Sequence, residues 1–382
     1  MSGENLLLDA IAGFAVHVSR RVSDLNGAIE SHRCKLLNNC TSSAAPKANI
    51  EFERPGNPFI NFVSRLLVAN AREPDQENTT YFAAADRIIA VGDVHGDLGA
   101  LRNVLKLSKL IGSNDEWVGG GTVLVQVGDL LDRGDQERAA FELLLKLRED
   151  AKKHGGAVHI LHGNHEIMNV SLDFRYVTPG GFVDFEPLAD QANEKLGKLP
   201  PAISETIKGL PEFMRSRAWS LRPGGPFSNR ISTNQLAIVI GDNVFVHGGL
   251  RPTHLAEPGA LETMNSACRA WMQGRAEKPS SLKTGKSPVW MRNYSLGSPK
   301  IGSDECNTLQ ASLDLIPAKR MIVGHTPQQQ GINAACAGKV WRIDTGMSAA
   351  YGGPPEALEI TKRRIRVLTA KGWRSAHSRS LN

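Results

Sequence analysis

Six potential metal ligands fall in five short, glycine-containing clusters of this 382-residue chain. The clusters read Gly-Asp-Val-His-Gly, Gly-Asp-Leu-Leu-Asp-Arg-Gly, Gly-Asn-His-Glu, His-Gly-Gly and Gly-His-Thr. Their carboxylate, amide and imidazole donors are Asp93, His95, Asp129, Asn164, His247 and His325. Mixed oxygen and nitrogen ligation without thiolates is typical of Mn, Fe or Zn rather than of a structural zinc finger. The pattern therefore predicts a catalytic centre that holds divalent ions.

Asp129 is the residue that we expect to bridge two ions. If six residues are to hold two ions ~3.5–4 Å apart, one carboxylate has to contact both. An Asp at the end of a central strand can do so, whereas Asn or His cannot. The glycines beside each ligand allow the backbone to turn sharply and to approach the metals closely.

Each cluster follows a short apolar run of strand length. These runs are 88–91, 123–127, 158–161, 244–246 and 321–323. Helical patterns over 101–110 and 136–153 separate the first three runs, and this alternation predicts an α/β sheet. In such sheets ligands collect beyond the carboxyl ends of the strands, which is where the polar clusters fall.

The rest of the chain divides into three predicted parts. Residues 1–80 indicate an N-terminal amphipathic helix, over 1–25, and a linker. Residues 81–360 contain the clusters and form the expected catalytic domain, which a Pro-rich helical insertion interrupts over 171–235. Residues 361–382 indicate a basic C-terminal strand and tail.

The charge distribution does not favour a nucleic-acid partner. The chain has 45 Lys and Arg against 39 Asp and Glu, a net charge of +6. Residues 361–382 contain seven basic and no acidic residues, so the remainder carries −1. A solvated tail or a local contact with an anionic partner explains this pattern. No uncharged apolar run approaches the ~18 residues that span a bilayer, so we expect no integral membrane association.

Five cysteines without a CxxC pair predict neither a disulfide framework nor a cysteine zinc site. A reducing compartment is therefore expected. Glu4 and Asp9 precede any basic cluster, unlike a secretory or transit signal, and we predict a cytoplasmic protein. Cys34 and Cys40 lie six positions apart; they are either two ordinary thiols or a pair that closes a small loop under oxidising conditions.

The order of the five clusters resembles the phosphoprotein phosphatase branch of the metallophosphoesterase superfamily. The resemblance spans 87–350 and implies that superfamily's α/β/β/α fold, a β-sandwich flanked by helices. Three details are similar to the Shewanella-like protein phosphatases rather than to human-type Ser/Thr phosphatases. Leu130 and Leu131 replace Tyr-Val, His162 replaces Arg, and 343–353 replaces the SAPNYC loop.

The resemblance implies which ion each donor holds. The first ion would be bound by Asp93, His95 and Asp129. The second ion would be bound by Asp129, Asn164, His247 and His325. A hydroxide shared by the two ions would attack phosphorus in line, because coordination lowers the pKa of water toward neutrality. We expect Mn to support activity in vitro, with Fe and Zn as the other candidates.

The resemblance also implies the residues that act on the substrate. His165 would protonate the leaving alkoxide, and Asp132 would orient its imidazole. Arg133 would grip phosphate oxygens as a planar fork. Arg292 is a candidate for a second phosphate-binding arginine and Tyr351 for a tyrosine that overhangs the site; the alternative for both is an ordinary surface or packing residue.

The sequence therefore predicts a metal-dependent phosphoprotein phosphatase that acts on phosphorylated proteins or peptides. Two alternatives stay open at this stage. A dinucleoside polyphosphate hydrolase would share all five motifs. A non-catalytic adaptor that binds anions through the basic tail belongs to a different functional class, and an intact donor set argues against it.

Overall fold

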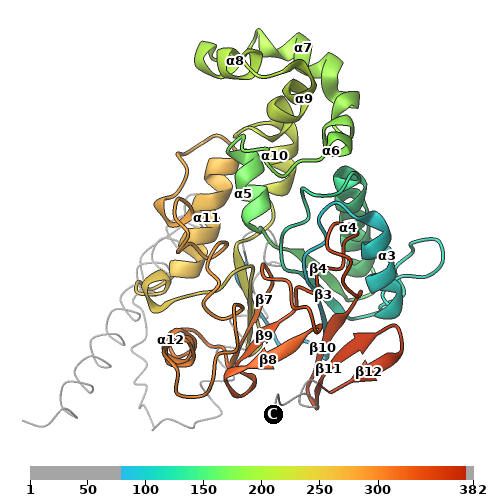
Figure 1. Cartoon of the computed structure of the whole chain (residues 1–382), viewed down its shortest axis with the longest axis vertical. Coiled ribbons are helices and arrows are strands. Elements are labelled where there is room, and N and C mark those ends of the chain that lie inside the picture. Colours follow the sequence, from blue (N-terminus) through green and yellow to red (C-terminus); the bar gives the residue numbers. More distant parts are fainter. Residues whose placement is uncertain (1–78, 376–382) are drawn as a thin grey trace, which may run out of the picture. The chain divides into compact units, whose positions relative to one another are not determined.

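A computed structural model describes residues 79–375, which form two six-stranded sheets with helices outside them (Figure 1). The predicted helix over 1–25 lies outside the described residues, as do Cys34, Cys40 and residues 376–382. The α/β/β/α sandwich predicted from the sequence is confirmed.

The first sheet contains the strands that precede the first three clusters. Its order is β12-β11-β10-β2-β3-β4. The three parallel strands are β2 (Arg87–Val91), β3 (Val123–Gln126) and β4 (Ala157–Ile160). An antiparallel extension consists of β10 (Ala357–Thr361), β11 (Ile365–Thr369) and β12 (Gly372–Arg374). The basic C-terminal segment thus contributes two strands to this sheet.

The second sheet contains the strands that precede the last two clusters. Its order is β1-β5-β6-β7-β9-β8. Its strands are β1 (Tyr81–Phe82), β5 (Ala237–Ile240), β6 (Asn243–Val246), β7 (Arg320–Val323), β8 (Asn333–Ala335) and β9 (Val340–Arg342). Strands β6, β7 and β9 run parallel, so the chain leaves β6 and β7 at the same edge.

The sheets pack face to face through alternate residues of each strand. In β2, Ile88 and Ala90 face the second sheet and share an apolar cluster with Phe245 and Ile322. The intervening Ile89 belongs to the cluster that packs beneath the helices. This period of two places every second side chain in the sandwich and the others under a helix.

Helices cover both outer faces of the sandwich (Figure 1). Over the first sheet lie α3 (Leu98–Leu107) and α4 (Glu137–Lys152). Beside the second lie α11 (Ala260–Met272) and α12 (Asp304–Leu313). Short 3-10 turns occupy Pro252–His254, Ser280–Leu282 and Cys336–Gly338.

The helical insertion leaves the sandwich after α5 (Asn164–Val170) and has an apolar cluster of its own. It contains α6 (Pro179–Val183), a 3-10 turn (Glu186–Leu188), α7 (Ala189–Leu196), α8 (Pro201–Lys208), α9 (Glu212–Leu221) and α10 (Pro226–Ile231). Helices α6 to α9 project beyond the sheets at the top of Figure 1. The chain then returns to the second sheet through β5.

A disulfide joins Cys306 to Cys336, a pair that the sequence analysis did not predict when it expected no disulfide framework. The two residues are 30 positions apart, and folding brings their Cα atoms to 5.3 Å. Because no motif marks this pair, its spacing gave no signal. The free cysteine of residues 79–375 is the buried Cys268. No helix in this range is long and apolar enough to cross a membrane.

Candidate metal centre

The five clusters converge at the carboxyl ends of the central strands of both sheets. Asp129 lies within 4.8 Å, ligand atom to ligand atom, of two sets of donors. One set adds His95 and His165, and the other adds His247 and His325. Asp129 is shared by both, as a bridging carboxylate must be. The parallel strands therefore bring the polar clusters together at their carboxyl ends, as the sequence predicts.

The two remaining predicted donors lie against the same group. Asp93 Oδ1 is 4.0 Å from His247 Nδ1, and its carboxylate accepts hydrogen bonds from the backbone N–H of His325 at 3.1 and 3.3 Å. Asn164 Oδ1 lies 3.1 Å from His247 Nε2. All six predicted donors are buried.

Backbone carbonyl groups orient three of the imidazoles. His95 Nδ1 donates to Leu131 O at 3.0 Å, and His247 Nδ1 donates to Val127 O at 2.9 Å. His325 donates through Nε2 to Trp290 O at 3.0 Å. Each bond fixes the tautomer and leaves the other ring nitrogen as a lone-pair donor, the arrangement usual for metal-ligating histidines.

The backbone at the site is strained so that the donors can converge. His95, Asp129 and His325 have φ angles of 49°, 53° and 69°, values that residues other than glycine seldom adopt. Gly163 and Gly324 are required for another reason. A Cβ at either position would collide with the carboxylate of Asp129 or of Asp93, respectively. These glycines therefore let neighbouring loops approach the donors closely.

Burial and neighbouring charges shift the pKa values of the predicted donors in different directions. Burial, together with Asp344 and Asp129, raises the pKa of Asp93 well above its usual range. Burial lowers the pKa of His95 to about 4, which keeps its ring neutral at pH 7. Burial works to raise the pKa of Asp129, but His247, His165 and His95 outweigh it and hold that pKa well below its usual range. Metal binding requires an ionised carboxylate, so binding of an ion would release the proton that burial favours on Asp93.

Asp344 is a buried carboxylate at the site that the sequence analysis did not single out. Burial raises its pKa to about 6, and its side chain is hydrogen-bonded to Asp93. Its Oδ1 accepts from the backbone N–H of Gly346 at 2.8 Å. Asp344 follows β9 without a histidine or glycine beside it, so only its position in the sheet reveals it.

His165 and Asp132 form a close pair at the edge of the donor cluster. His165 Nδ1 lies 2.6 Å from Asp132 Oδ2, and the His165 ring centroid is 4.8 Å from that of His95. Burial opposes protonation, but Asp129 and Asp132 raise the pKa of His165 above its ordinary value. The arrangement is that of an imidazolium held in one orientation by a carboxylate.

Arg133 lies between two tyrosines beside this pair. Its guanidinium carbon is 4.5 Å from the ring centroid of Tyr176 and 5.2 Å from that of Tyr351. The Tyr351 ring lies 5.5 Å from that of His95, so the structure places this predicted residue at the site. Tyr176, 5.2 Å from the ring of His165, was missed because it lies in the insertion without a recognisable motif.

Arg292 lies beside His325. Its Nη1 donates to the backbone oxygen of His325 at 2.7 Å and to Thr326 Oγ1 at 2.8 Å. The side chain is exposed. The structure therefore brings every predicted site residue to the strand ends.

Comparison with known proteins shows the family. Residues 86–329 match the family model described as calcineurin-like phosphoesterase. The chain is 40% identical over 325 residues to Shewanella-like protein phosphatase 2 of Arabidopsis thaliana, covering 78% of this chain and 82% of that protein. It is 30% identical over 330 residues to Shewanella-like protein phosphatase 1 of Plasmodium berghei, with 82% and 83% covered. The chain belongs to the Shewanella-like protein phosphatases. The family resemblance inferred from the five clusters is confirmed.

Solved structures agree with this assignment at the level of fold. This Shewanella-like phosphatase matches the cold-active protein-tyrosine phosphatase of a psychrophilic Shewanella species with a TM-score of 0.59. The match covers 80% of this chain and 86% of that one at 22% identity. Metallophosphoesterases use two divalent ions, and the donor groups around Asp129 suit such a pair.

Glu166 supports the donors of this phosphatase from below. One carboxylate oxygen accepts from the backbone N–H groups of Asp129 and Gly163 at 2.9 and 2.6 Å. The other accepts from Leu130 and Leu131 at 2.8 and 3.0 Å. The last residue of the Gly-Asn-His-Glu cluster thus holds the loop that carries Asp129, a role that its sequence context did not specify.

A buried network supports Asp132 from the insertion. Arg217 of α9 is fully buried; its guanidinium contacts Asp132 Oδ1 at 3.3 Å and Glu137 Oε2 at 2.6 Å. Asn169 donates to Asp132 Oδ1 at 2.8 Å and accepts from Arg217. Arg217 lies 85 positions from Asp132, and a lone arginine in a helical pattern gave no signal of this contact.

Proposed function

We propose that this chain hydrolyses the phosphate monoesters of phosphorylated proteins or peptides at the strand-end site. The observation that carries the proposal is the 2.6 Å contact between His165 and Asp132 at the edge of a buried donor cluster. A metal site by itself can also serve structure or storage. A protonatable imidazole, oriented by a carboxylate and placed beside the donors, is suited to expelling an alkoxide.

The donors would hold two divalent ions in the division that the family resemblance implies. The first site would use Asp93, His95 and Asp129. The second site would use Asp129, Asn164, His247 and His325. When bound, the ions supply a water-derived nucleophile at neutral pH and neutralise charge on the phosphoryl group. Asp129 would contribute its carboxylate to both sites.

His165 acts as the general acid in this proposal. Its raised pKa keeps a proton available near neutral pH, and Asp132 holds Nδ1 so that Nε2 faces the departing oxygen. Arg217 and Asn169 in turn hold Asp132 and stop it from rotating away. A series of contacts therefore connects the insertion, through Asp132, to the imidazole that would protonate the leaving group.

Arg133 binds the phosphate, and the tyrosines at its faces limit where its fork can point. Cation–π stacking on Tyr176 and Tyr351 leaves the edge of the guanidinium for planar contacts with phosphate oxygens. Arg292 contributes a second positive charge from beside His325. Tyr351 closes the site on the side of His95.

Mn is the ion that we expect to restore activity to metal-free protein, because the donors are oxygen and imidazole nitrogen without thiolate. We propose the cytoplasm as the compartment of this protein. The Cys306–Cys336 disulfide weighs against a strongly reducing compartment, because such bonds persist mainly in oxidising ones. Localisation of a tagged full-length chain tests this point.

Turnover of a phosphopeptide and of diadenosine tetraphosphate, each with Mn²⁺, tests the function. We expect the phosphopeptide to be hydrolysed with the higher kcat/KM and chelation to abolish turnover. Preference for the dinucleotide would favour the polyphosphate hydrolase that the sequence left open. Full activity in metal-stripped protein would contradict the mechanism.

A further inference from the structure

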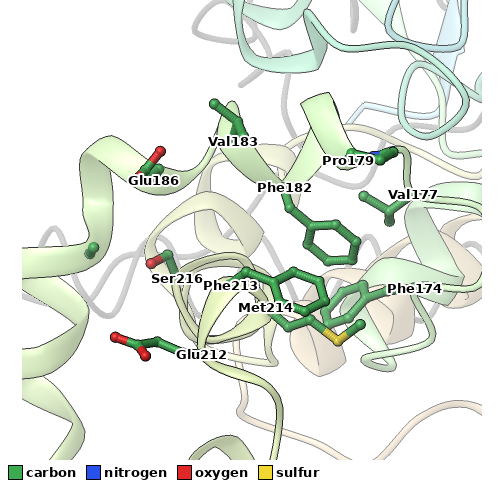
Figure 2. A pocket seen from close by; sticks show the side chains of 11 residues that line it. Phe174, Val177, Pro179, Phe182, Val183, Glu186, Glu212, Phe213, Met214 and Ser216 are labelled. Atoms are coloured by element: carbon green, nitrogen blue, oxygen red, sulfur yellow. The ribbon is translucent and has the colours of Figure 1, made fainter.

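An apolar pocket of about 900 Å³ opens in the helical insertion, outside the metal centre (Figure 2). Its apolar lining includes Phe174, Val177, Phe182, Val183, Phe213 and Met214. The ring of Phe182 meets those of Phe213 and Phe174 edge to face, with centroids 5.1 and 6.1 Å apart. The volume is within the range of pockets that bind small ligands or side chains.

The pocket is open to solvent, and a buried hydrogen bond connects the two helices that form its walls. Val183 of α6 and Phe213 of α9 are each 60% exposed. On the buried side of the same two helices, Arg217 donates to Gly181 O at 2.9 Å. An exposed apolar concavity on a braced scaffold is typical of an interaction site.

The pocket begins one residue from the proposed phosphate site. Tyr176 contacts Arg133 and His165, while its neighbour Val177 lines the pocket. The backbone N–H of Arg133 also donates to Tyr176 O at 3.1 Å. A chain bound with its phosphate at Arg133 therefore reaches the pocket within a few residues, since extended backbone advances ~3.3 Å per residue.

Two carboxylates mark the far end of the pocket. Glu186 and Glu212 are exposed and line it across from Val177 in Figure 2. A segment that enters past Val177 would meet apolar rings first and negative charge afterwards. The lining thus complements an apolar side chain that is followed by a cationic one.

We propose that this pocket binds the phosphoprotein substrate through a large apolar residue and an adjacent Lys or Arg, a few positions from the phosphorylated residue. The inference rests on the proposed function and adds to it a determinant of which phosphoproteins are chosen. Phe213, Val183 and Phe182 receive the apolar side chain. Glu186 and Glu212 attract the cation.

Matched phosphopeptides test the pocket on the full-length chain with Mn²⁺. All peptides carry the same phosphorylated residue, the one that the enzyme hydrolyses fastest. In each peptide one dipeptide, Phe-Arg, Phe-Glu or Ala-Ala, begins two, three or four positions before or after that residue. At one placement we expect Phe-Arg to raise kcat/KM at least about ten-fold over Ala-Ala, because the ring leaves water. A gain below about two-fold at every placement would overturn the proposal.

Variants locate the effect in the pocket. Phe213→Ser should remove the Phe-Arg gain and leave hydrolysis of p-nitrophenyl phosphate unchanged. The double variant Glu186→Lys, Glu212→Lys should instead favour Phe-Glu, a reversal that a merely structural role would not produce. Ile301→Ser, at an 80% exposed apolar position outside the insertion, is the matched control and should keep the gain.

The outcomes separate this proposal from the function on which it rests. No hydrolysis of any phosphate ester would contradict the proposed function. Hydrolysis of all peptides without discrimination would contradict the pocket proposal alone. If Phe213→Ser raised turnover of p-nitrophenyl phosphate, a segment of the chain itself would be the occupant, and the proposal would be wrong.

Discussion

The donor cluster and the helical insertion meet at Asp132 and are built by different means. The cluster lies on loops that leave parallel strands, and short motifs place its polar side chains in a buried, hydrogen-bonded group. The insertion turns aromatic rings toward solvent and supplies one buried arginine to the site. In the functions proposed above, the strand ends supply the chemistry, whereas the insertion positions Asp132 and selects the substrate.

The substitution Asp129→Asn is the strongest test of the proposal that the strand ends supply the metal site. An amide is a poor bridging ligand, so we expect loss of both ions and of all measurable phosphatase activity. Elemental analysis of the purified protein checks metal content. Asp190→Asn, at an exposed position of the insertion, is the control and should retain both ions. Two tightly held metals in Asp129→Asn would remove the bridging assignment.

His165→Ala separates catalysis from metal binding. We expect an intact metal content and a fall in kcat of ~10²–10⁴ on alkyl phosphates, the usual contribution of a general acid. Aryl phosphates should be affected less, because their leaving groups need less protonation. An equal loss on both substrates would exclude the acid role, and loss of metal would indicate that His165 is a ligand.

Two substitutions on α9 compare the inner and outer sides of the insertion. Arg217→Ala leaves Asp132 and Glu137 buried without their cation, and we expect a loss of ~3–5 kcal/mol in unfolding free energy. Phe213→Ser, on the exposed side, should cost less, about 1 kcal/mol, because the ring is 60% exposed and packs on one side against Phe182. Urea denaturation checks both. Similar losses in the two variants would contradict the division of α9 into a supporting face and a binding face.

His162 makes the region of the donor cluster sensitive to acid. Burial lowers the pKa of His162 to about 3, whereas in the unfolded chain it is about 6.5. Between these values the unfolded state binds a proton that the folded state does not, so stability falls as pH falls through this window. In a plot of unfolding free energy against pH, His162→Leu should therefore reduce the slope below pH 6 by about 1 kcal/mol per pH unit. An unchanged slope, measured by denaturation in metal-free buffer, would exclude this contribution.

The strands and the donors could be predicted because their signals are local. Each apolar run is directly followed by its polar cluster, and parallel pairing of β2, β3 and β4 necessarily brings the clusters to one edge. The helices α3 and α4 also follow from the periodicity of their own residues. Asp344 escaped prediction because a lone carboxylate after a strand resembles an ordinary turn residue.

What the sequence by itself determined is the type of chemistry: the six predicted donors, His165 and Asp132 each stand in a short local motif, and the order of these motifs along the chain indicated the family. Only the tertiary structure placed Arg217 against Asp132, Tyr176 against Arg133, and Cys306 beside Cys336. These contacts join positions 30 to 85 residues apart. They depend on how the insertion and α12 pack onto the sandwich, and packing is settled by the summed burial of many side chains rather than by a motif.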